Sequence, residues 1–280
     1  MIEAPEARLL AGQLNETIKG KTISMAIAGY TPHKFSWYYG DPAGYGEMLE
    51  GRTVDGASAV GGYVEIRAGS VVMLFGDGAN LRYYAPGEDL PKKHQLLIGF
   101  SDESCLVGSV RMYGALLAFP EGAPATGFTP YYEGAKAKPQ VMSAAFTREY
   151  FDALAADPAV QNKSAKAFLA TEQRIPGLGN GVLQDMLYTA GINPKTKMEK
   201  LTGAEKARMY DSVAAVMEQI YESGGRNSES DLFGRSGGYV PYLSKDTAGH
   251  ECTRCGSVII KENYMGGSIY YCPGCQPLRK

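Results

Sequence analysis

Four cysteines near the end of this chain restrict its fold more than any other feature. They form two pairs, each with two residues inside it and with sixteen residues between the pairs: Cys252, Cys255, Cys272 and Cys275. Such spacing is typical of a four-cysteine zinc ribbon, in which two tight turns direct four thiolates at one tetrahedral ion. The stretch between the pairs predicts a hairpin of two short strands, residues 257–260 and 268–271. The alternative use of the same cysteines is a pair of disulfides.

The start of the sequence favours the metal over the disulfides. Charged residues appear at once, so no signal peptide is expected, and no apolar run approaches the roughly 18 residues of a membrane span. We therefore expect a cytoplasmic protein, in which a reducing environment keeps thiols available as ligands. The prediction is one structural zinc ion held by all four thiolates. The fifth cysteine, Cys105, lies in an apolar run that resembles a strand and is expected to be a buried thiol.

Charge is distributed unevenly along the chain, although its formal net charge is only −2. Residues 161–210 hold eight Lys or Arg and four Asp or Glu, and residues 235–280 hold six and three. These segments carry +4 and +3, so the rest of the chain carries −9. A basic stripe in the C-terminal half is typical of a localised phosphate-binding face, but ordinary solvated helix faces give the same counts. The net charge itself argues against indiscriminate binding of nucleic acid.

The first half of the chain changes from one helix to many strands. Residues 5–19 predict an amphipathic helix, with Pro5 at its start and Gly20 at its end. Short β-rich runs separated by Gly, Asp and Pro then predict a β-sandwich or barrel. The expected strands are residues 22–28, 63–67, 71–75, 95–100, 104–110 and 115–119.

The second half reads as helical, after a connector that lacks periodicity at residues 120–139. The expected helices are residues 150–155, 164–171, 181–190 and 203–221. A loop rich in Gly and Ser, residues 223–238, leads into the ribbon. A chain of 280 residues is long enough for two domains and a small metal-bound module. We predict domains at residues 1–135, 136–235 and 236–280.

One turn between two predicted helices has the composition of an anion site. The sequence Ile175-Pro-Gly-Leu-Gly-Asn-Gly181 leads directly to the N-terminus of the next helix, whose dipole favours a negative charge. Phosphate is the natural ligand, although a Gly-x-Gly by itself is more often only a tight turn. Lys166 on the preceding helix and the zinc ribbon beyond it strengthen the prediction of a phosphate site.

In this order of elements the chain resembles the formamidopyrimidine-DNA glycosylase and endonuclease VIII family over nearly its full length. The most specific matches are Pro176 to Asn180, Ala190 to Pro194, Gly224 to Tyr239 and Cys252 to Gln276. The resemblance implies a multidomain α and β protein with an N-terminal β-sandwich, a leading helix, a helix-two-turns-helix domain and a C-terminal zinc ribbon. It implies a monomer that binds double-stranded DNA with a damaged base or an abasic site.

The resemblance also implies a reaction and its residues. In that family an N-terminal proline attacks the sugar C1′ through its α-amine, whose ordinary pKa of about 7.7–8.0 leaves far more neutral amine than a lysine has. The proline's position is matched by Ile2, the family's proton-transferring glutamate by Glu3, and a second glutamate by Glu6. The residues expected to contact DNA are Lys166, Gly177, Gly179, Asn180, Arg111 and Tyr113.

The chain departs from the family at four places near this centre. Ile2 stands where the family has proline, and methionine removal is expected to be poor before so large a residue. Gly62 replaces a catalytic lysine, and Gly267 replaces an arginine that grips phosphate. The intercalating methionine loop is altered at residues 75–78.

Three hypotheses for function remain open on the sequence. The first is a DNA glycosylase with abasic-site lyase activity that uses whichever α-amine is exposed. The second is a catalytically impaired relative that binds damaged or abasic DNA as a sensor. The third is an RNA or protein adaptor whose paired tyrosines serve as stacking faces, although such pairs more often pack in a core. The tyrosines concerned are Tyr38, Tyr39, Tyr83, Tyr84, Tyr131 and Tyr132.

Overall fold

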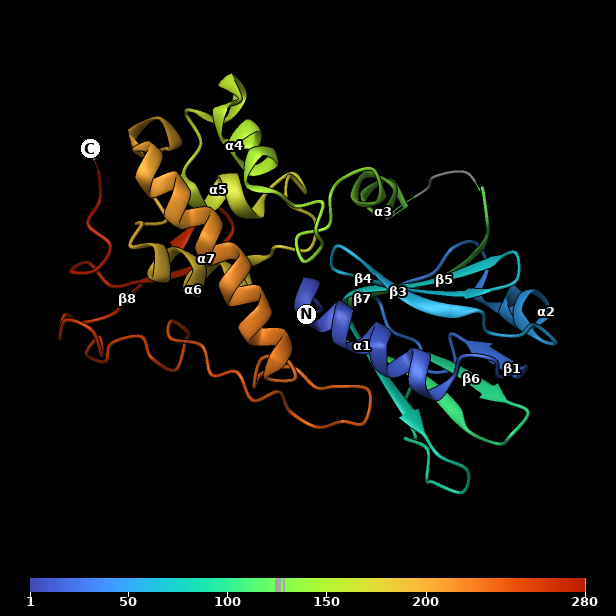
Figure 1. Cartoon of the computed structure of the whole chain (residues 1–280). Coiled ribbons are helices and arrows are strands. Elements are labelled where there is room, and N and C mark those ends of the chain that lie inside the picture. Colours follow the sequence, from blue (N-terminus) through green and yellow to red (C-terminus); the bar gives the residue numbers. More distant parts are fainter. Residues whose placement is uncertain (124–126, 128, 280) are drawn as a thin grey trace.

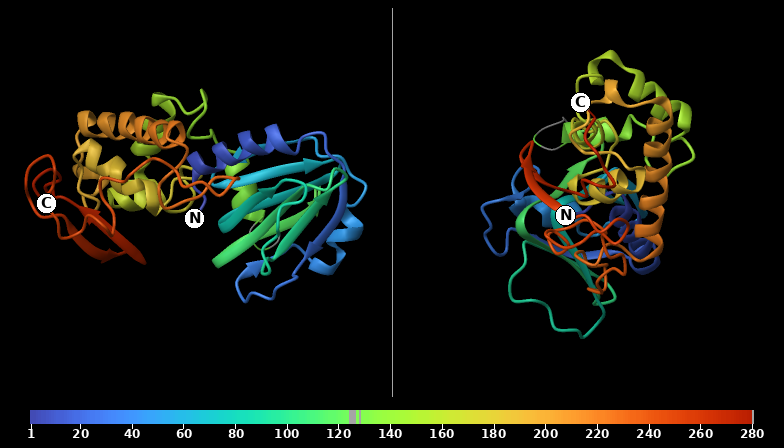
Figure 2. Two further views of the ribbon diagram at one scale, coloured as in Figure 1. Left: turned by 90° about the horizontal axis from the view of Figure 1, so that it is seen from below. Right: turned by 90° about the vertical axis from the view of Figure 1, so that its left-hand side faces the viewer.

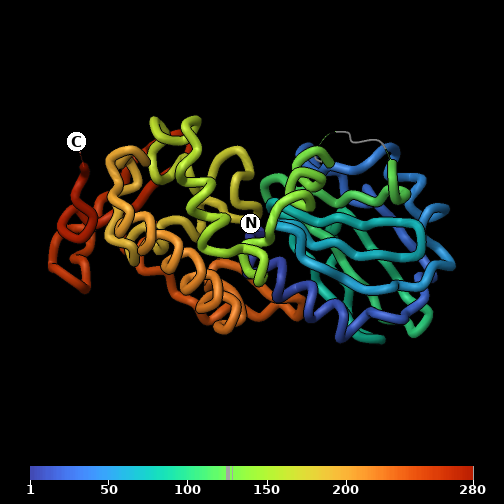
Figure 3. Tube along the Cα trace, turned by 45° about the horizontal axis from the view of Figure 1, so that its top comes forward, coloured from blue at the N-terminus to red at the C-terminus, as the bar shows by residue number. Residues whose placement is uncertain are grey.

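The computed structural model describes residues 1–123, residue 127 and residues 129–279. One half is built on a β-sheet and the other on helices, and the N-terminus lies between the two halves (Figure 1; Figure 3). Within the described residues, no helix combines the length and the apolar character that crossing a membrane requires.

The helices and strands largely follow the sequence predictions. The α-helices among the described residues are α1 (Ala4–Thr17), α2 (Tyr45–Leu49), α3 (Thr129–Lys136), α4 (Arg148–Ala156), α5 (Ala165–Ala170), α6 (Asn180–Ala190) and α7 (Gly203–Glu222). The strands are β1 (Ile23–Ala28), β2 (Ser36–Trp37), β3 (Gly56–Val60), β4 (Tyr63–Ala68), β5 (Val71–Tyr84), β6 (Leu96–Phe100), β7 (Cys105–Pro120), β8 (Ile260–Tyr264) and β9 (Gly267–Tyr271). Short 3-10 turns lie at Pro42–Gly44, Pro158–Val160 and Met198–Lys200.

Helix α1 begins directly after Glu3 because capping groups are present there. The Glu6 carboxylate accepts a hydrogen bond from the backbone N–H of Glu3 (3.3 Å), as in a capping box. Pro5 lies in the first turn, where its missing N–H leaves no intrahelical bond unmade. Leu10 and Leu14 then bury one face of the helix in the core of the sheet. The helix therefore carries the N-terminal residues along the sheet to the junction of the two halves.

The sheet is a continuous hydrogen-bonded array in the order β1-β6-β7-β5-β4-β3, with β2 paired to β7. Strands β5 and β7 are long and pair with each other from end to end, and their register shifts between Asp77 and Ala79. The altered segment at residues 75–78 is thus part of β5 rather than a loop. Strand β7 also unites the two strands predicted at residues 104–110 and 115–119. Gly114, the last residue between them, continues the ladder by pairing with Asp77.

A helix covers each face of this sheet. Helix α1 packs on one face, and α3 covers the other through Tyr132, which contacts the rings of Tyr63 and Phe119. The connector predicted to be irregular therefore contains a helix. This helix is too short for its sequence to show a helical period, and burial of Tyr132 against the sheet stabilises it. Cys105, predicted to be buried, is only partly buried at the start of β7.

The helical half has a separate core between α4, α5, α6 and α7, centred on Phe151, Phe168 and Leu183. The hairpin of β8 and β9 packs on this half through contacts of β9 with α6 (Figure 2). Its first strand begins at Ile260, three residues later than the predicted start at residue 257. The preceding residues instead form the cysteine turn, where Val258 bridges to Glu251.

Candidate functional site

The N-terminal segment passes from the sheet half to the helical half within a few residues. The backbone N–H of Ile2 donates to the carbonyl of Asp77 in β5 (2.7 Å). The N–H of Ala4 donates to the carbonyl of Gly177 in the turn before α6 (2.9 Å). The Ile2 side chain is buried in the core of the sheet. These contacts fix the segment to both halves at the point where they meet.

The Glu3 carboxylate is the anion at the N-terminus of α6. Its Oε1 accepts a hydrogen bond from the N–H of Gly181 (2.8 Å), and its Oε2 accepts from Gly179 (3.2 Å) and Val182 (3.1 Å). The sequence predicted a phosphate at this turn, but the Glu3 carboxylate of the N-terminal segment accepts from these N–H groups instead. Glu3 is only 4% exposed. Glu3 therefore has a structural role, which is to cap the N-terminus of α6. The sequence pattern did not show this role.

A buried arginine that the sequence analysis did not single out joins this centre. Arg226, 5% exposed, donates through Nε and Nη2 to the two oxygens of Glu6 (2.7 and 3.1 Å). Its Nη1 lies 3.4 Å from Oε1 of Glu3, and Nη2 donates to the carbonyl of Met1 (3.0 Å). The segment of residues 224–239 was one of the specific family matches, but its composition predicts only irregular structure and assigns no role to Arg226.

Opposing effects act on the proton affinity of Glu3. Burial raises the pKa of Glu3, because a charged carboxylate loses its hydration. The positive charge of Arg226 opposes this effect, the neighbouring Glu6 adds to it, and the N–H groups of Gly181 and Val182 oppose it again. The net shift is upward, so Glu3 retains a proton to higher pH than an exposed glutamate does.

A cavity of about 250 Å³ opens beside the N-terminus. The α-amine of Met1 donates to the carboxylate of Glu229 (2.7 Å) at its wall. Arg111 and Tyr113, predicted to contact DNA, line the same cavity from β7. Between them Met112 is 69% exposed. The structure thus brings the predicted arginine–aromatic pair to the N-terminal segment.

Lys166 and Asn180 also lie close to each other, although they come from different helices. Both hold the zinc hairpin: Nζ of Lys166 donates to the carbonyl of Tyr264 (2.6 Å), and Nδ2 of Asn180 donates to that of Ser268 (3.0 Å). Burial lowers the pKa of Lys166 from its usual value. A Cβ atom on Gly267 would lie 3.5 Å from Nζ of Lys166. A side chain at position 267 would therefore share this surface.

The glycines of the turn are needed for close packing. Gly177 has a φ of +79°, and a Cβ there would overlap the backbone of the hairpin turn at Gly61. A Cβ on Gly179 would lie 2.8 Å from the Glu3 carboxylate. At Gly62 a Cβ would meet the carbonyl oxygen of Ile2 at 3.2 Å. A lysine at position 62 would thus extend directly beside the N-terminal segment.

Most of the paired tyrosines are taken up by packing. Tyr38 contacts the ring of Tyr45, Tyr39 that of Phe119, and Tyr83 that of Phe233. Tyr84 is partly buried beside Arg82 and Tyr132 is fully buried, whereas Tyr131 is exposed. Few of these rings are therefore free to stack on a base.

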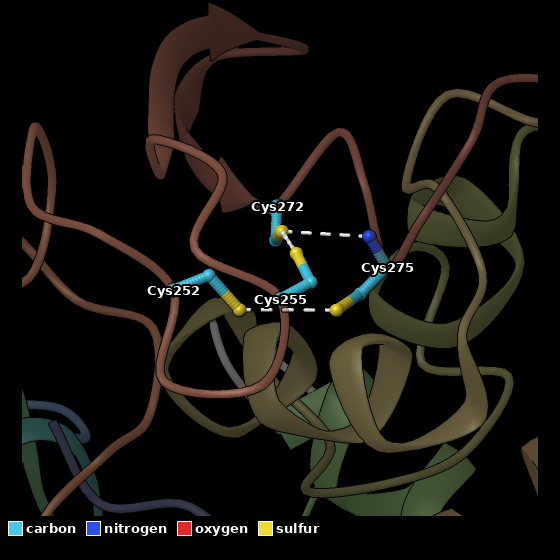
Figure 4. Close-up of side chains that lie close together, drawn as sticks. All are labelled: Cys252, Cys255, Cys272 and Cys275. Carbon is cyan, nitrogen blue, oxygen red and sulfur yellow. Dashed lines mark hydrogen bonds between the residues drawn. The ribbon is translucent and has the colours of Figure 1, made fainter.

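The four predicted ligand cysteines converge on one point (Figure 4). Their sulfur atoms all lie within 4.8 Å of one another, and Sγ of Cys252 lies 3.8 Å from that of Cys275. Zinc–sulfur bonds of about 2.3 Å in a tetrahedron place the sulfurs about 3.8 Å apart, so the donor set fits zinc. The described cysteines form no disulfide. They make a zinc-ribbon site with no open coordination position.

Comparisons with known proteins agree with this arrangement. No protein-family model matches the chain. It is 27% identical over 287 residues to the formamidopyrimidine-DNA glycosylase of Streptococcus pneumoniae, covering 99% of both chains. It is 26% identical over 289 residues to that of Neisseria meningitidis, covering 99% and 100%.

A solved structure shares the fold of the whole chain. Lactococcus lactis Fpg in complex with DNA containing an abasic site superposes with a TM-score of 0.81 at 22% identity, covering 98% of this chain and 99% of that one. The match spans the sheet half, the helical half and the cysteine hairpin.

Proposed function

We propose, from the premise that this chain belongs to the formamidopyrimidine-DNA glycosylase family, that it binds damaged double-stranded DNA and excises a base from it. In the proposed reaction an N-terminal α-amine attacks C1′ of the sugar, the bond from C1′ to the base breaks, and an imine forms. The imine then allows cleavage at the abasic site. Glu3 transfers the proton during sugar opening, and Glu6 supports it.

The observation that carries this proposal is the position of Glu3. A buried carboxyl with a raised pKa keeps its proton to higher pH than an exposed glutamate does, which suits it to proton transfer. It stands two residues from the α-amine of Met1 and borders the small cleft formed with Gly62 and Gly177. While Met1 is present, the nitrogen of Ile2 is an amide, so the amine available to react is that of Met1. Removal of Met1 would transfer the role to Ile2.

The proposed DNA contacts occupy two surfaces on either side of this centre. Lys166 and Asn180 would hold phosphates beside the hairpin of β8 and β9, next to the turn at Gly177 and Gly179. Arg111 and Tyr113 would fill the space left by a nucleotide that turns out of the stack. The DNA complex described for Lactococcus lactis Fpg supports the same orientation here, because the folds superpose over both halves.

A second function is supported by the two missing cations. Gly62 and Gly267 stand beside the N-terminal segment and beside Lys166, where the family's lysine and arginine would supply charge. Their loss removes electrostatic stabilisation while the rest of the DNA-binding surface remains. A sensor that binds abasic DNA without turnover is therefore the alternative.

Borohydride trapping separates these functions. We expect the protein to form a covalent adduct with DNA containing an abasic site, because reduction converts the imine to a stable amine. Mass spectrometry of the trapped peptide identifies the reacting amine. The control is a variant with an acetylated N-terminus, which should bind DNA and form no adduct. If the native chain gives none and the combination of Ile2→Pro, Gly62→Lys and Gly267→Arg gives one, the sensor function replaces the catalytic one.

Binding to DNA is tested by changing Lys166 to alanine. We expect weaker binding to all sequences alike and a salt dependence whose slope falls by about one unit, because one phosphate contact is lost. Fluorescence anisotropy with abasic-site DNA over a range of salt concentrations measures both. The matched control is Lys163→Ala, since Lys163 is paired with Glu172 at 2.7 Å. An unchanged slope in Lys166→Ala would remove this residue from the interface.

A further inference from the structure

Arg226 is the only arginine of the described chain that contacts both N-terminal glutamates. Its place depends on the loop of residues 223–239, which is itself tightly fixed. Leu232 of this loop is buried in the core of the sheet, and the N–H of Tyr83 donates to the carbonyl of Leu232 (2.9 Å). At the other end, the N–H of Asn227 donates to the carbonyl of Tyr239 (2.8 Å). The guanidinium is therefore held against α1 and α6 by a folded loop.

We propose that Arg226 is a positioning residue of this centre, which orients Glu3 and Glu6 and holds the carbonyl of Met1, and that Gly181 is the residue that admits it. This proposal rests on the proposed function. It assigns to Arg226 the compensation of negative charge at a centre where positions 62 and 267 carry no cation.

Gly181 gives the second, independent observation. It lies in the first turn of α6, where alanine is the better helix former. A Cβ on Gly181 would nevertheless overlap Nη1 of Arg226 and lie 2.6 Å from Oε1 of Glu3. Only a residue without a side chain leaves room for the guanidinium over this turn. The glycine and the arginine, far apart in the sequence, are thus sterically coupled.

The balance of charge around Glu3 shows why the guanidinium matters. The titratable and charged groups near it come from several parts of the chain: Glu6 on α1, Tyr63 and Asp77 on the sheet, Arg226 and Glu229 in the loop, and the α-amine of Met1. Carboxylates outnumber cations in this set. Without Arg226, the buried Glu3 and Glu6 would face each other without a cation between them.

This arrangement predicts how the proton affinity of Glu3 changes. Arg226 lowers the pKa of Glu3 against the larger effect of burial. Removing the guanidinium should therefore raise the pKa of Glu3 further. It should also release the carboxylate of Glu6 and the carbonyl of Met1, so that the α-amine and Glu3 lose their common arrangement.

The experiment compares Arg226→Gln, Arg226→Lys and Gly181→Ala in the full chain. The third variant keeps the arginine but displaces it, because the flexible guanidinium must move to accommodate the new methyl group. Matched controls on α1 are Arg8→Gln, which removes an exposed pair with Glu218, and Gly12→Ala, where no atom lies within 4 Å of the new methyl group.

Carbon-13 NMR of labelled glutamate carboxyls, with Glu3 assigned from Glu3→Gln, measures the titration directly without requiring turnover. We expect the midpoint of Glu3 to rise in Arg226→Gln and Gly181→Ala, to stay closer to the parent in Arg226→Lys, and not to change in the controls. Turnover on abasic DNA should fall by about 10²-fold in Arg226→Gln and Gly181→Ala, as a misplacement of about 1 Å can cause.

The two readouts separate this inference from the proposed function. If the parent shows no turnover but the Glu3 midpoint still shifts in the variants, the positioning role is supported and the catalytic function is overturned. An unchanged Glu3 titration in both Arg226→Gln and Gly181→Ala would overturn the positioning role, whatever the activity of the parent.

Discussion

Serine at position 275 is expected to abolish zinc binding and to unfold the C-terminal hairpin. The hairpin buries few apolar side chains of its own, chiefly Ile259, Ile269 and Tyr271. Structural zinc contributes apparent binding energies of about 10–16 kcal/mol in small modules, far more than such a core supplies. Metal analysis should find one zinc per native chain and none in Cys275→Ser. Protease digestion should cleave the variant first between residues 250 and 279.

Loss of the zinc should also reach the DNA-binding surface. Unfolding of the hairpin removes the carbonyls of Tyr264 and Ser268 that hold Lys166 and Asn180. We therefore expect Cys275→Ser to lose affinity for abasic DNA, measured by fluorescence anisotropy. Cys105→Ser is the control, because Cys105 lies in β7, away from the cluster. Native zinc content with intact DNA binding in Cys275→Ser would contradict the structural role of the metal.

Glutamine at position 3 is expected to slow turnover by about 10²–10⁴-fold while leaving affinity for abasic DNA nearly unchanged. This is the usual contribution of a positioned general acid or base. The glutamine side chain has almost the same shape, and its one amide oxygen can still accept from the N–H groups of Gly179 and Val182. Its amide nitrogen cannot accept from Gly181, so one of the three hydrogen bonds to α6 is lost. Single-turnover kinetics and anisotropy measure the two quantities separately. Glu16→Gln, an exposed glutamate of the same helix, is the control.

The pH dependence of turnover gives this prediction a sign. Burial raises the pKa of Glu3, so its protonated form persists to higher pH than that of an ordinary glutamate. If this form donates the proton, activity falls as pH rises through the raised pKa, and Glu3→Gln should lack that descending limb. Equal turnover in Glu3→Gln and the parent would exclude Glu3 from proton transfer.

Features encoded by residues close together in the sequence were predictable. The cysteine spacing predicted the zinc ribbon, and the apolar repeat of Leu10 and Leu14 predicted α1. The glycines before α6 predicted an anion at its N-terminus. In each case the pattern arises within one or two turns of the chain, so local geometry is enough to express it.

Longer-range features depended on how the segments pack. Helix α3 has little intrinsic periodicity and is held by burial of Tyr132. Strand β7 reads as two strands because Arg111 to Gly114 interrupt its apolar pattern, yet pairing with β5 makes it continuous. The identity of the anion at α6 was also outside the reach of local pattern, since Glu3 arrives there from the opposite end of the chain.

The sequence by itself determined the main classes of element and the zinc site, and it proposed the residues that would carry the chemistry. Only the tertiary structure decided that Arg226 joins Glu3 and Glu6 above Gly181, and that the N-terminal segment lies against Gly62 and Asp77. The physical reason is that two buried carboxylates need a compensating positive charge, and that the guanidinium fits beside them only where a residue has no side chain. Both requirements arise only once the loop, both helices and the sheet are packed together.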